Sequence, residues 1–94
     1  MADSIAYVMI GTEVGAAARV AQTVAQVDGV HWTATVTGQY DVIAAVRVAD
    51  NTALADLIDE GINVVPGIGM TSTAVALRWF GPDGKPAQDG PPPP

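Results

Sequence analysis

Two kinds of hydrophobic pattern alternate along the chain. Four short runs are continuously apolar or alternate between apolar and polar residues, which is typical of β-strands. They span residues 5–11, 30–36, 42–48 and 70–77. Between the first two runs, and again between the last two, apolar residues recur at the spacing of an amphipathic helix. The predicted order of elements is βαββαβ.

The first predicted helix lies between residues 12 and 27. Thr12 stands where a helix cap is expected, and Glu13 suits the positive end of the helix dipole. The turn Asp28-Gly29 ends this element. The apolar positions expected to recur on its buried side are Val14, Ala17, Ala18, Ala21, Val24 and Ala25.

The second predicted helix begins at a cap formed by Asp50 or Asn51 and ends before Pro66-Gly67. Its expected buried positions are Leu54, Leu57, Ile58 and Ile62. Its expected solvent-facing positions are Asp56, Asp59 and Glu60. Because those carboxylates have no His or further carboxylate at ligand spacing, we interpret them as a solvated face and expect no metal site.

The two halves of the chain resemble each other. Val27-Asp28-Gly29-Val30 follows the first helix, and Val65-Pro66-Gly67-Ile68 follows the second. Two βαβ halves with right-handed crossovers predict a ferredoxin-like α+β fold. In that fold a four-stranded antiparallel sheet carries both helices on one face, and its other face is left open.

The open sheet face is predicted to be apolar. In the strand 30–36, one face is expected to carry Val30, Trp32, Ala34 and Val36. The other face is expected to carry His31, Thr33, Thr35 and Thr37. The strands 5–11 and 42–48, which we expect to be the outer ones, are apolar on both faces. A large exposed apolar face is unfavourable in water, so we expect it to pack on a second copy in a two-fold dimer.

Length and composition describe one small domain. We expect a folded domain over residues 1–80 and a disordered Pro- and Gly-rich tail over residues 81–94, which ends in four prolines. The 94-residue chain has no cysteine, so neither a disulfide nor a thiolate metal site supplements its core. Oligomerisation is the remaining common source of stability for a domain of this size.

The charge balance argues against nucleic acid as a direct partner. The net charge is −6, and the four Lys and Arg residues are scattered along the sequence. No basic, apolar leader precedes residue 5, and no run approaches the roughly 20 apolar residues of a membrane span. We therefore expect a cytoplasmic protein with no membrane partner.

Catalytic and cofactor-binding patterns are weak. The single histidine, His31, falls in a strand and is interpreted as a sheet-surface residue. With no cysteine, a Cys–His nucleophilic pair is excluded. The glycines form neither a phosphate-binding loop nor a dinucleotide fingerprint, so we expect no cofactor.

The link between the two middle strands carries the most suggestive residues, Thr37-Gly38-Gln39-Tyr40-Asp41. Its length and its glycine predict a β-hairpin. Two interpretations stay open. In the structural one, Gly38 supplies a positive φ and Asp41 accepts from a nearby backbone N–H. In the functional one, Asp41 accepts from the ammonium group of a ligand, an interaction that is strong only where water is excluded.

The functional interpretation also involves the last strand. Thr71 and Thr73 would add hydroxyl groups, and Gly67 and Gly69 would let the backbone approach a ligand closely. In a small domain, the exclusion of water would most naturally come from another subunit.

Several of these motifs together resemble the ligand-binding domain of the Lrp/AsnC transcriptional regulators, also called the RAM domain. They are Ala6-Tyr7-Val8-Met9-Ile10, Val27-Asp28-Gly29-Val30, the segment 36–42 with its Gly-x-Tyr-Asp turn, and Val65-Pro66-Gly67-Ile68 followed by Thr71-Ser72-Thr73. The resemblance covers residues 5–77. It implies the βαββαβ fold and a non-enzymatic, amino-acid-binding function.

The resemblance further implies how such a site is built. Family members dimerise through the sheet face, assemble into rings that are commonly octamers, and bind amino acids between dimers. The positions implied here are Gly38, Gln39, Tyr40, Asp41, Gly67, Thr71 and Thr73. Gln39 stands at a position that is often acidic in relatives. The first strand begins by residue 5, so we expect a stand-alone domain that senses an amino acid or co-assembles with a full-length regulator.

Two other functions remain open at this point. The domain can be an assembly adaptor with no ligand, in which case the hairpin tip is an interface element. It can also be an enzyme of the small ferredoxin-like monooxygenase or isomerase type. Only His31 and Arg47 are candidates for the polar group that such an enzyme needs between sheet and helices.

Overall fold

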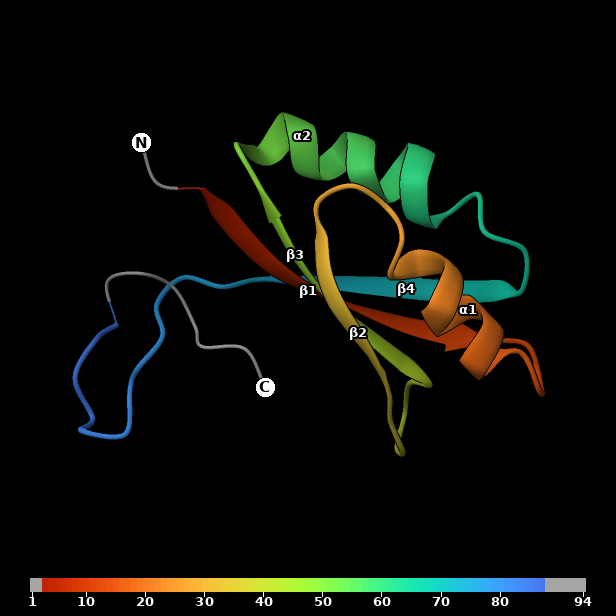
Figure 1. The fold of residues 1–94 in the computed structure, drawn as a ribbon, viewed down its shortest axis with the longest axis horizontal. Helices are drawn as coiled ribbons and strands as arrows, with labels where there is room; N and C mark the ends of the chain where they lie inside the picture. The colour runs from red at the N-terminus through yellow and green to blue at the C-terminus, as the bar shows by residue number, and fades with distance from the viewer. Residues whose placement is uncertain (1–2, 88–94) are drawn as a thin grey trace.

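Four strands form a single antiparallel sheet in a computed structural model, which describes residues 3–87 (Figure 1). The strands are β1 (Ser4–Thr12), β2 (Val30–Thr35), β3 (Val42–Val48) and β4 (Ile68–Val75). They lie side by side in the order β2-β3-β1-β4, which confirms the predicted ferredoxin-like α+β fold. The predicted positions of two strands within the sheet were wrong. β1 and β3 are the central strands rather than the outer ones, because each helical crossover skips a strand.

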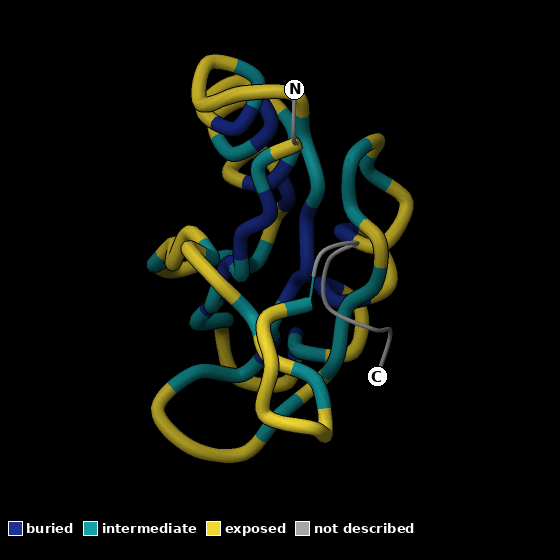
Figure 2. The backbone as a smooth tube through the Cα atoms, turned by 90° about the vertical axis from the view of Figure 1, so that its left-hand side faces the viewer, coloured by how far each residue is buried: buried dark blue, intermediate teal, exposed yellow. Residues whose placement is uncertain are grey.

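Both helices pack on the same face of this sheet. α1 (Ala17–Val24) follows β1, whereas α2 (Asn51–Asp56) follows β3 and continues into a π-helical segment, η1 (Leu57–Ile62). Side chains from all three helical segments share one apolar cluster with alternate residues of β1 and β3. Its largest fully buried members are Ile10, Ile62, Val8, Val20, Val24, Val42 and Val46. In Figure 2 the buried segments run through the middle of the molecule and the turns around them are exposed.

The second helix follows its sequence pattern closely. The side chain of Asp50 caps α2 by accepting a hydrogen bond of 2.8 Å from the backbone N–H of Ala53. Leu54, Leu57 and Ile62 are buried as predicted, and Ile58 is half-buried. The three carboxylates of the predicted polar face, Asp56, Asp59 and Glu60, are exposed.

The predicted start of the first helix was wrong. Thr12 is the last residue of β1, and the helix begins only at Ala17, with no side-chain cap. Val14 was expected on the buried side, yet it is 106% exposed in the turn before the helix. The reason is Gly15, whose φ of +80° belongs to the left-handed region and interrupts any right-handed helix there.

A bulge corrects the expected faces of β2. The register shifts between Val30 and Trp32, so these two residues lie on opposite faces of the sheet instead of the same one. Val30 and Thr33 are on the helix-covered face, where the Thr33 hydroxyl donates to the Ala21 carbonyl at 2.8 Å. His31 falls in the bulge and is exposed.

The open face of the sheet is mostly apolar, as predicted. Strand alternation and register bring together Tyr7 of β1, Ala45 of β3 and Trp32 of β2 along one row. The neighbouring row pairs Met9 with Ile43 and with Ser72. None of the helices described between residues 3 and 87 covers this face, because their buried side chains join the cluster on the other side.

The segment after β4, residues 76–87, is called here the C-terminal arm. The Ala76 N–H donates to the Ile5 carbonyl at 2.8 Å, and further on Phe80 and Pro86 form an isolated bridge. Ala87 N–H donates to the Trp79 carbonyl at 2.9 Å, which closes the turn. The predicted tail is thus described only over residues 81–87, and residues 88–94 lie outside the described part of the chain.

Gly67 joins the start of β4 to α1. Its φ is +100°, and its carbonyl accepts from the Glu13 N–H at 2.8 Å. A Cβ atom at this position would meet Arg19 Nη2 at 2.5 Å and the Ala16 Cβ at 3.3 Å. The conformation therefore favours glycine, and a larger residue would also displace the Arg19 guanidinium and crowd Ala16.

We expect Gly67→Ala to lower the free energy of unfolding by about 1–3 kcal/mol, because it combines a strained backbone conformation with a contact against α1. Chemical denaturation measures this change. Gly69→Ala is the matched control. The nearest atom to a Cβ at Gly69 is the Gly11 carbonyl oxygen at 3.6 Å, an ordinary contact. Equal losses in the two variants would contradict this explanation.

Candidate functional site

The predicted hairpin tip is a real turn between β2 and β3. The Val36 N–H donates to the Asp41 carbonyl at 2.9 Å, which closes the loop. Gly38 has the predicted positive φ, at +124°, and a Cβ placed on it would have no atom within 4 Å. Gln39 is exposed and Tyr40 is half-buried. The tip is therefore open to solvent, while its base is tightly held.

Asp41 ties this hairpin to the end of β1. Its backbone N–H donates to the Ile10 carbonyl at 2.9 Å. Its side-chain Oδ2 accepts from the Thr12 N–H at 2.8 Å in a half-buried position. This is the bond that the structural interpretation of Asp41 predicted. One carboxylate oxygen is thus engaged within the chain, and the carboxylate is fixed beside the turn that contains Val14.

The start of β4 reaches the same end of β1. Glu13 follows Thr12 directly, and its N–H donates to the Gly67 carbonyl at 2.8 Å. Arg19 of α1 donates through Nη1 to the Pro66 carbonyl at 2.8 Å. Two adjacent backbone N–H groups, those of Thr12 and Glu13, therefore hold the hairpin on one side and the 66–67 turn on the other. Residues far apart in sequence converge here.

The two predicted threonines lie on β4 at different depths. Thr71 pairs with Ile10, so it stands across β1 from Asp41 and is half-buried. Thr73 pairs with Val8, farther along the strand toward the middle of the sheet, and is exposed. The structure thus brings Asp41, Gly67 and Thr71 to one end of β1. Thr73 lies two residues farther along β4, toward the middle of the sheet.

Sequence reasoning missed the part played by residues 12–15 and Arg19. Thr12 was assigned to a helix cap, whereas its backbone N–H is the partner of the Asp41 side chain. The available signal was Gly15, which is incompatible with a helix starting at Thr12. No local pattern indicated that Arg19 would reach the Pro66 carbonyl, since that contact depends on how α1 packs.

Chemically, this corner offers a fixed carboxylate, an exposed turn and, at Gly38, a backbone with open space beside it. The described residues contain no group of three or more His, Cys, Asp or Glu residues able to hold a metal ion. No helix in the described part of the chain is long and apolar enough to cross a bilayer. His31 and Arg47 belong to the exposed bulge and the open sheet face, not to the helix-covered side.

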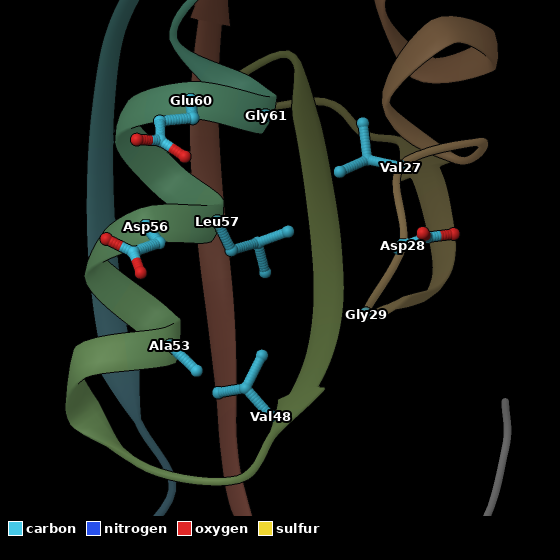
Figure 3. Close-up of a pocket in the computed structure, with 9 residues that line it drawn as sticks. All are labelled: Val27, Asp28, Gly29, Val48, Ala53, Asp56, Leu57, Glu60 and Gly61. Carbon is cyan, nitrogen blue, oxygen red and sulfur yellow. The ribbon is translucent and has the colours of Figure 1, made fainter.

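A shallow groove lies elsewhere on the molecule, between the α2–η1 helix and the turn that joins α1 to β2 (Figure 3). Its volume is about 570 Å³, and none of the predicted site residues lines it. Its apolar part consists of Val27, Val48, Ala53 and Leu57, and three acidic residues stand around it: Asp28, Asp56 and Glu60.

Comparison with known proteins gives one family. The model of the Lrp/AsnC ligand binding domain matches residues 5–85, most of the chain. The chain belongs to the Lrp/AsnC ligand-binding domain family. Membership of this family makes the Lrp/AsnC domain a non-enzymatic regulatory module of a small-molecule-binding type, so the enzyme interpretation is not supported. No curated protein sequence matched the chain.

Solved structures share its fold. TTHA0845 from Thermus thermophilus is 29% identical with a TM-score of 0.77, covering 83% of this chain and 98% of that one. FFRP-DM1 is 30% identical with a TM-score of 0.74, covering 79% and 99%. The Neisseria meningitidis transcriptional regulator NMB0573 is 16% identical with a TM-score of 0.70, covering 80% and 50%. The Lrp/AsnC domain thus corresponds to about half of that regulator.

Removing the Asp41 side chain should destabilise this Lrp/AsnC domain. We expect Asp41→Ala to lower the free energy of unfolding by about 1–2 kcal/mol, because the Thr12 N–H loses its charged acceptor. Asp41→Asn keeps an acceptor oxygen and should cost less than about 1 kcal/mol. Denaturant titration measures both changes, with the exposed Asp59→Ala as control. If Asp41→Ala is as stable as the control, the hydrogen bond does not contribute to the free energy of unfolding.

Proposed function

We propose that this domain binds an amino acid at the end of β1 and senses its concentration. The observation that supports the proposal is the convergence of the hairpin tip and the 66–67 turn on two adjacent N–H groups, those of Thr12 and Glu13. That convergence lies beside an exposed turn and holds a carboxylate in a fixed position. A preorganised group of this kind binds a small polar ligand at a low conformational cost.

In this proposal each predicted residue has a role. Asp41 accepts from the α-ammonium group, and Gly38 leaves open space for the ligand. Gln39 and Tyr40 cover it. Gly67 holds the turn at the edge of the site, while the Thr71 and Thr73 hydroxyls donate to the ligand carboxylate. The L-Met complex of NMB0573, a regulator with the same fold, supports amino acids as the ligand class.

A single copy leaves this corner open to water, which weakens a carboxylate–ammonium contact. Assembly of several copies would exclude water from this corner. Two copies pack through the open sheet face, and dimers associate into a ring, such as an octamer, so that a neighbouring dimer covers each site. The apolar rows of Tyr7 and Met9 support the first of these contacts.

The proposed output of the sensor is transcriptional. Because the domain belongs to a regulator family and carries a net charge of −6, we propose that it acts through a full-length Lrp/AsnC partner in the cytoplasm and does not itself contact DNA. Co-assembly of the two chains in one ring would couple amino-acid binding to the partner.

Isothermal titration calorimetry with each of the twenty common amino acids tests the site. We expect at least one to bind with a dissociation constant of about 1 mM or tighter. Asp41→Asn should weaken that binding at least about tenfold, because Asn lacks the charge that pairs with the ammonium group yet keeps the Thr12 contact. Asp59→Asn is the matched control. No binding to the wild type, or unchanged binding to Asp41→Asn, would refute the assigned site.

An assembly adaptor with no ligand is the second candidate function. The Asp41–Thr12 hydrogen bond favours it, because that bond gives Asp41 a structural role that needs no ligand. The two functions differ in a melting experiment. A sensor gains thermal stability with increasing amino-acid concentration, whereas an adaptor melts at the same temperature throughout.

The sheet-face dimer has its own test. We expect Met9→Glu to shift the dimer toward monomer, because it places a carboxylate in the centre of the apolar face of both copies. Sedimentation velocity measures the shift. Val64→Glu is the control, since Val64 is 65% exposed in the turn after η1 and away from this face. A Met9→Glu protein that still sediments as a dimer would show that the contact lies elsewhere.

A further inference from the structure

The groove beside α2–η1 is a surface without an assigned partner. In Figure 3 the side chains of Val27 and Leu57 point into it from opposite walls, while the carboxylates of Asp56 and Glu60 extend from the outer side of the helix. Asp28 stands on the opposite side, in the turn after α1. The groove is therefore apolar at its centre and acidic around its edges.

The groove keeps its shape because of a close backbone approach. A Cβ atom on Gly61 of η1 would meet the Val27 side chain at Cγ1, 2.8 Å away, so a larger residue there would displace either Val27 or the helix. The π-helical segment supplies Leu57, Glu60 and Gly61 to this wall. Such segments are rare and are frequently found at functional sites. A shallow, open surface of this kind suits a protein segment better than a small molecule.

The C-terminal arm has the complementary chemistry. Leu77 is 92% exposed and Phe80 is 59% exposed, so within one copy the arm carries two large apolar side chains that little else covers. Arg78 and Lys85 lie among them and are also exposed, and with Asp83 as its one acidic residue the arm has two basic residues against one acidic residue. They are two of only four basic residues in the whole chain. In Figure 1 the arm projects away from the sheet and the helices.

Within one copy, polar groups of both the groove and the arm have no bonding partner among the described residues. The described residues give Asp28, Asp56 and Glu60 no ion pair and no hydrogen bond to their side chains. Within the described part of the chain, the indole Nε1 of Trp79 in the arm is buried and lacks an acceptor.

We propose that the C-terminal arm of one copy docks in the groove of a second copy. Leu77 and Phe80 lie over the shallow apolar surface that Val27, Val48 and Ala53 line. Arg78 and Lys85 pair with the carboxylates at the edges. The partner is a second copy because the same chain carries both halves of the match, and its own groove leaves Leu77 and Phe80 exposed. This contact is separate from the open sheet face and from the amino-acid site.

Zero-length crosslinking gives a direct test. Lys85 is the only lysine in the sequence, so a carbodiimide reagent can join few amines to the carboxylates. We expect mass spectrometry to find Lys85 joined to Asp28, Asp56 or Glu60. A mixture of isotopically labelled and unlabelled protein shows whether the joined residues come from different copies. Crosslinks only within one copy, or only to carboxylates outside the groove such as Asp59, would overturn the proposal.

Charge exchange tests the same contact in solution. All four side chains involved are exposed, so the variants should fold, which circular dichroism checks. We expect the groove variant D56K/E60K and the arm variant R78E/K85E each to raise the dissociation constant of this contact at least about tenfold in sedimentation equilibrium. A 1:1 mixture of the two should restore association, because each arm then finds a groove of opposite charge.

Asp59→Lys is the matched control, since it changes a charge on the same helical segment outside the groove. It should associate like the wild type. The arm contact should also persist in Met9→Glu, which separates it from the sheet-face dimer. Unchanged association of D56K/E60K, or failure of the 1:1 mixture to recover, would overturn the proposal. Failure of amino-acid binding would leave it standing.

Discussion

The structure depends on a sheet that is covered on one side only. Both helices bury their apolar side chains against the face that carries Val8, Ile10 and Val42, and one continuous core results. The opposite face keeps Tyr7, Met9 and other apolar side chains with no helix above them. Because water disfavours such a surface, a second copy is the simplest cover for it. The proposed site is therefore shielded from water only when copies assemble.

The candidate site lies at the end of the central strand β1, where three connections meet. The N–H groups of Thr12 and Glu13 bind the Asp41 side chain and the Gly67 carbonyl, and Arg19 holds the turn next to Gly67. Asp41 thus serves the fold whether or not it also binds a ligand. This double use explains why an Asp41→Ala variant alone cannot separate structure from binding, and why Asp41→Asn is the more informative substitution.

The sequence predicted the elements better than their contacts. The second helix was placed correctly because its signals are local: the Asp50 cap and the apolar stripe of Leu54, Leu57 and Ile62. The first helix began too early in the prediction, since Gly15 was given less weight than the spacing of Val14. The β2 bulge and the Thr12–Asp41 bond were not predictable, because both depend on strands that meet only in the folded sheet. The sequence predicted the hairpin, but not the hydrogen bonds that join Asp41 to the end of β1.

If the open sheet face packs on a second copy, the purified chain must have at least the molar mass of a dimer in solution. Static light scattering over about 1–100 μM protein should give at least twice the 9.6 kDa of one copy, with dissociation only at the lowest concentrations. A mass of 9.6 kDa at every concentration would contradict the account. A stable single copy would leave the sheet face and the amino-acid site without the cover that both require.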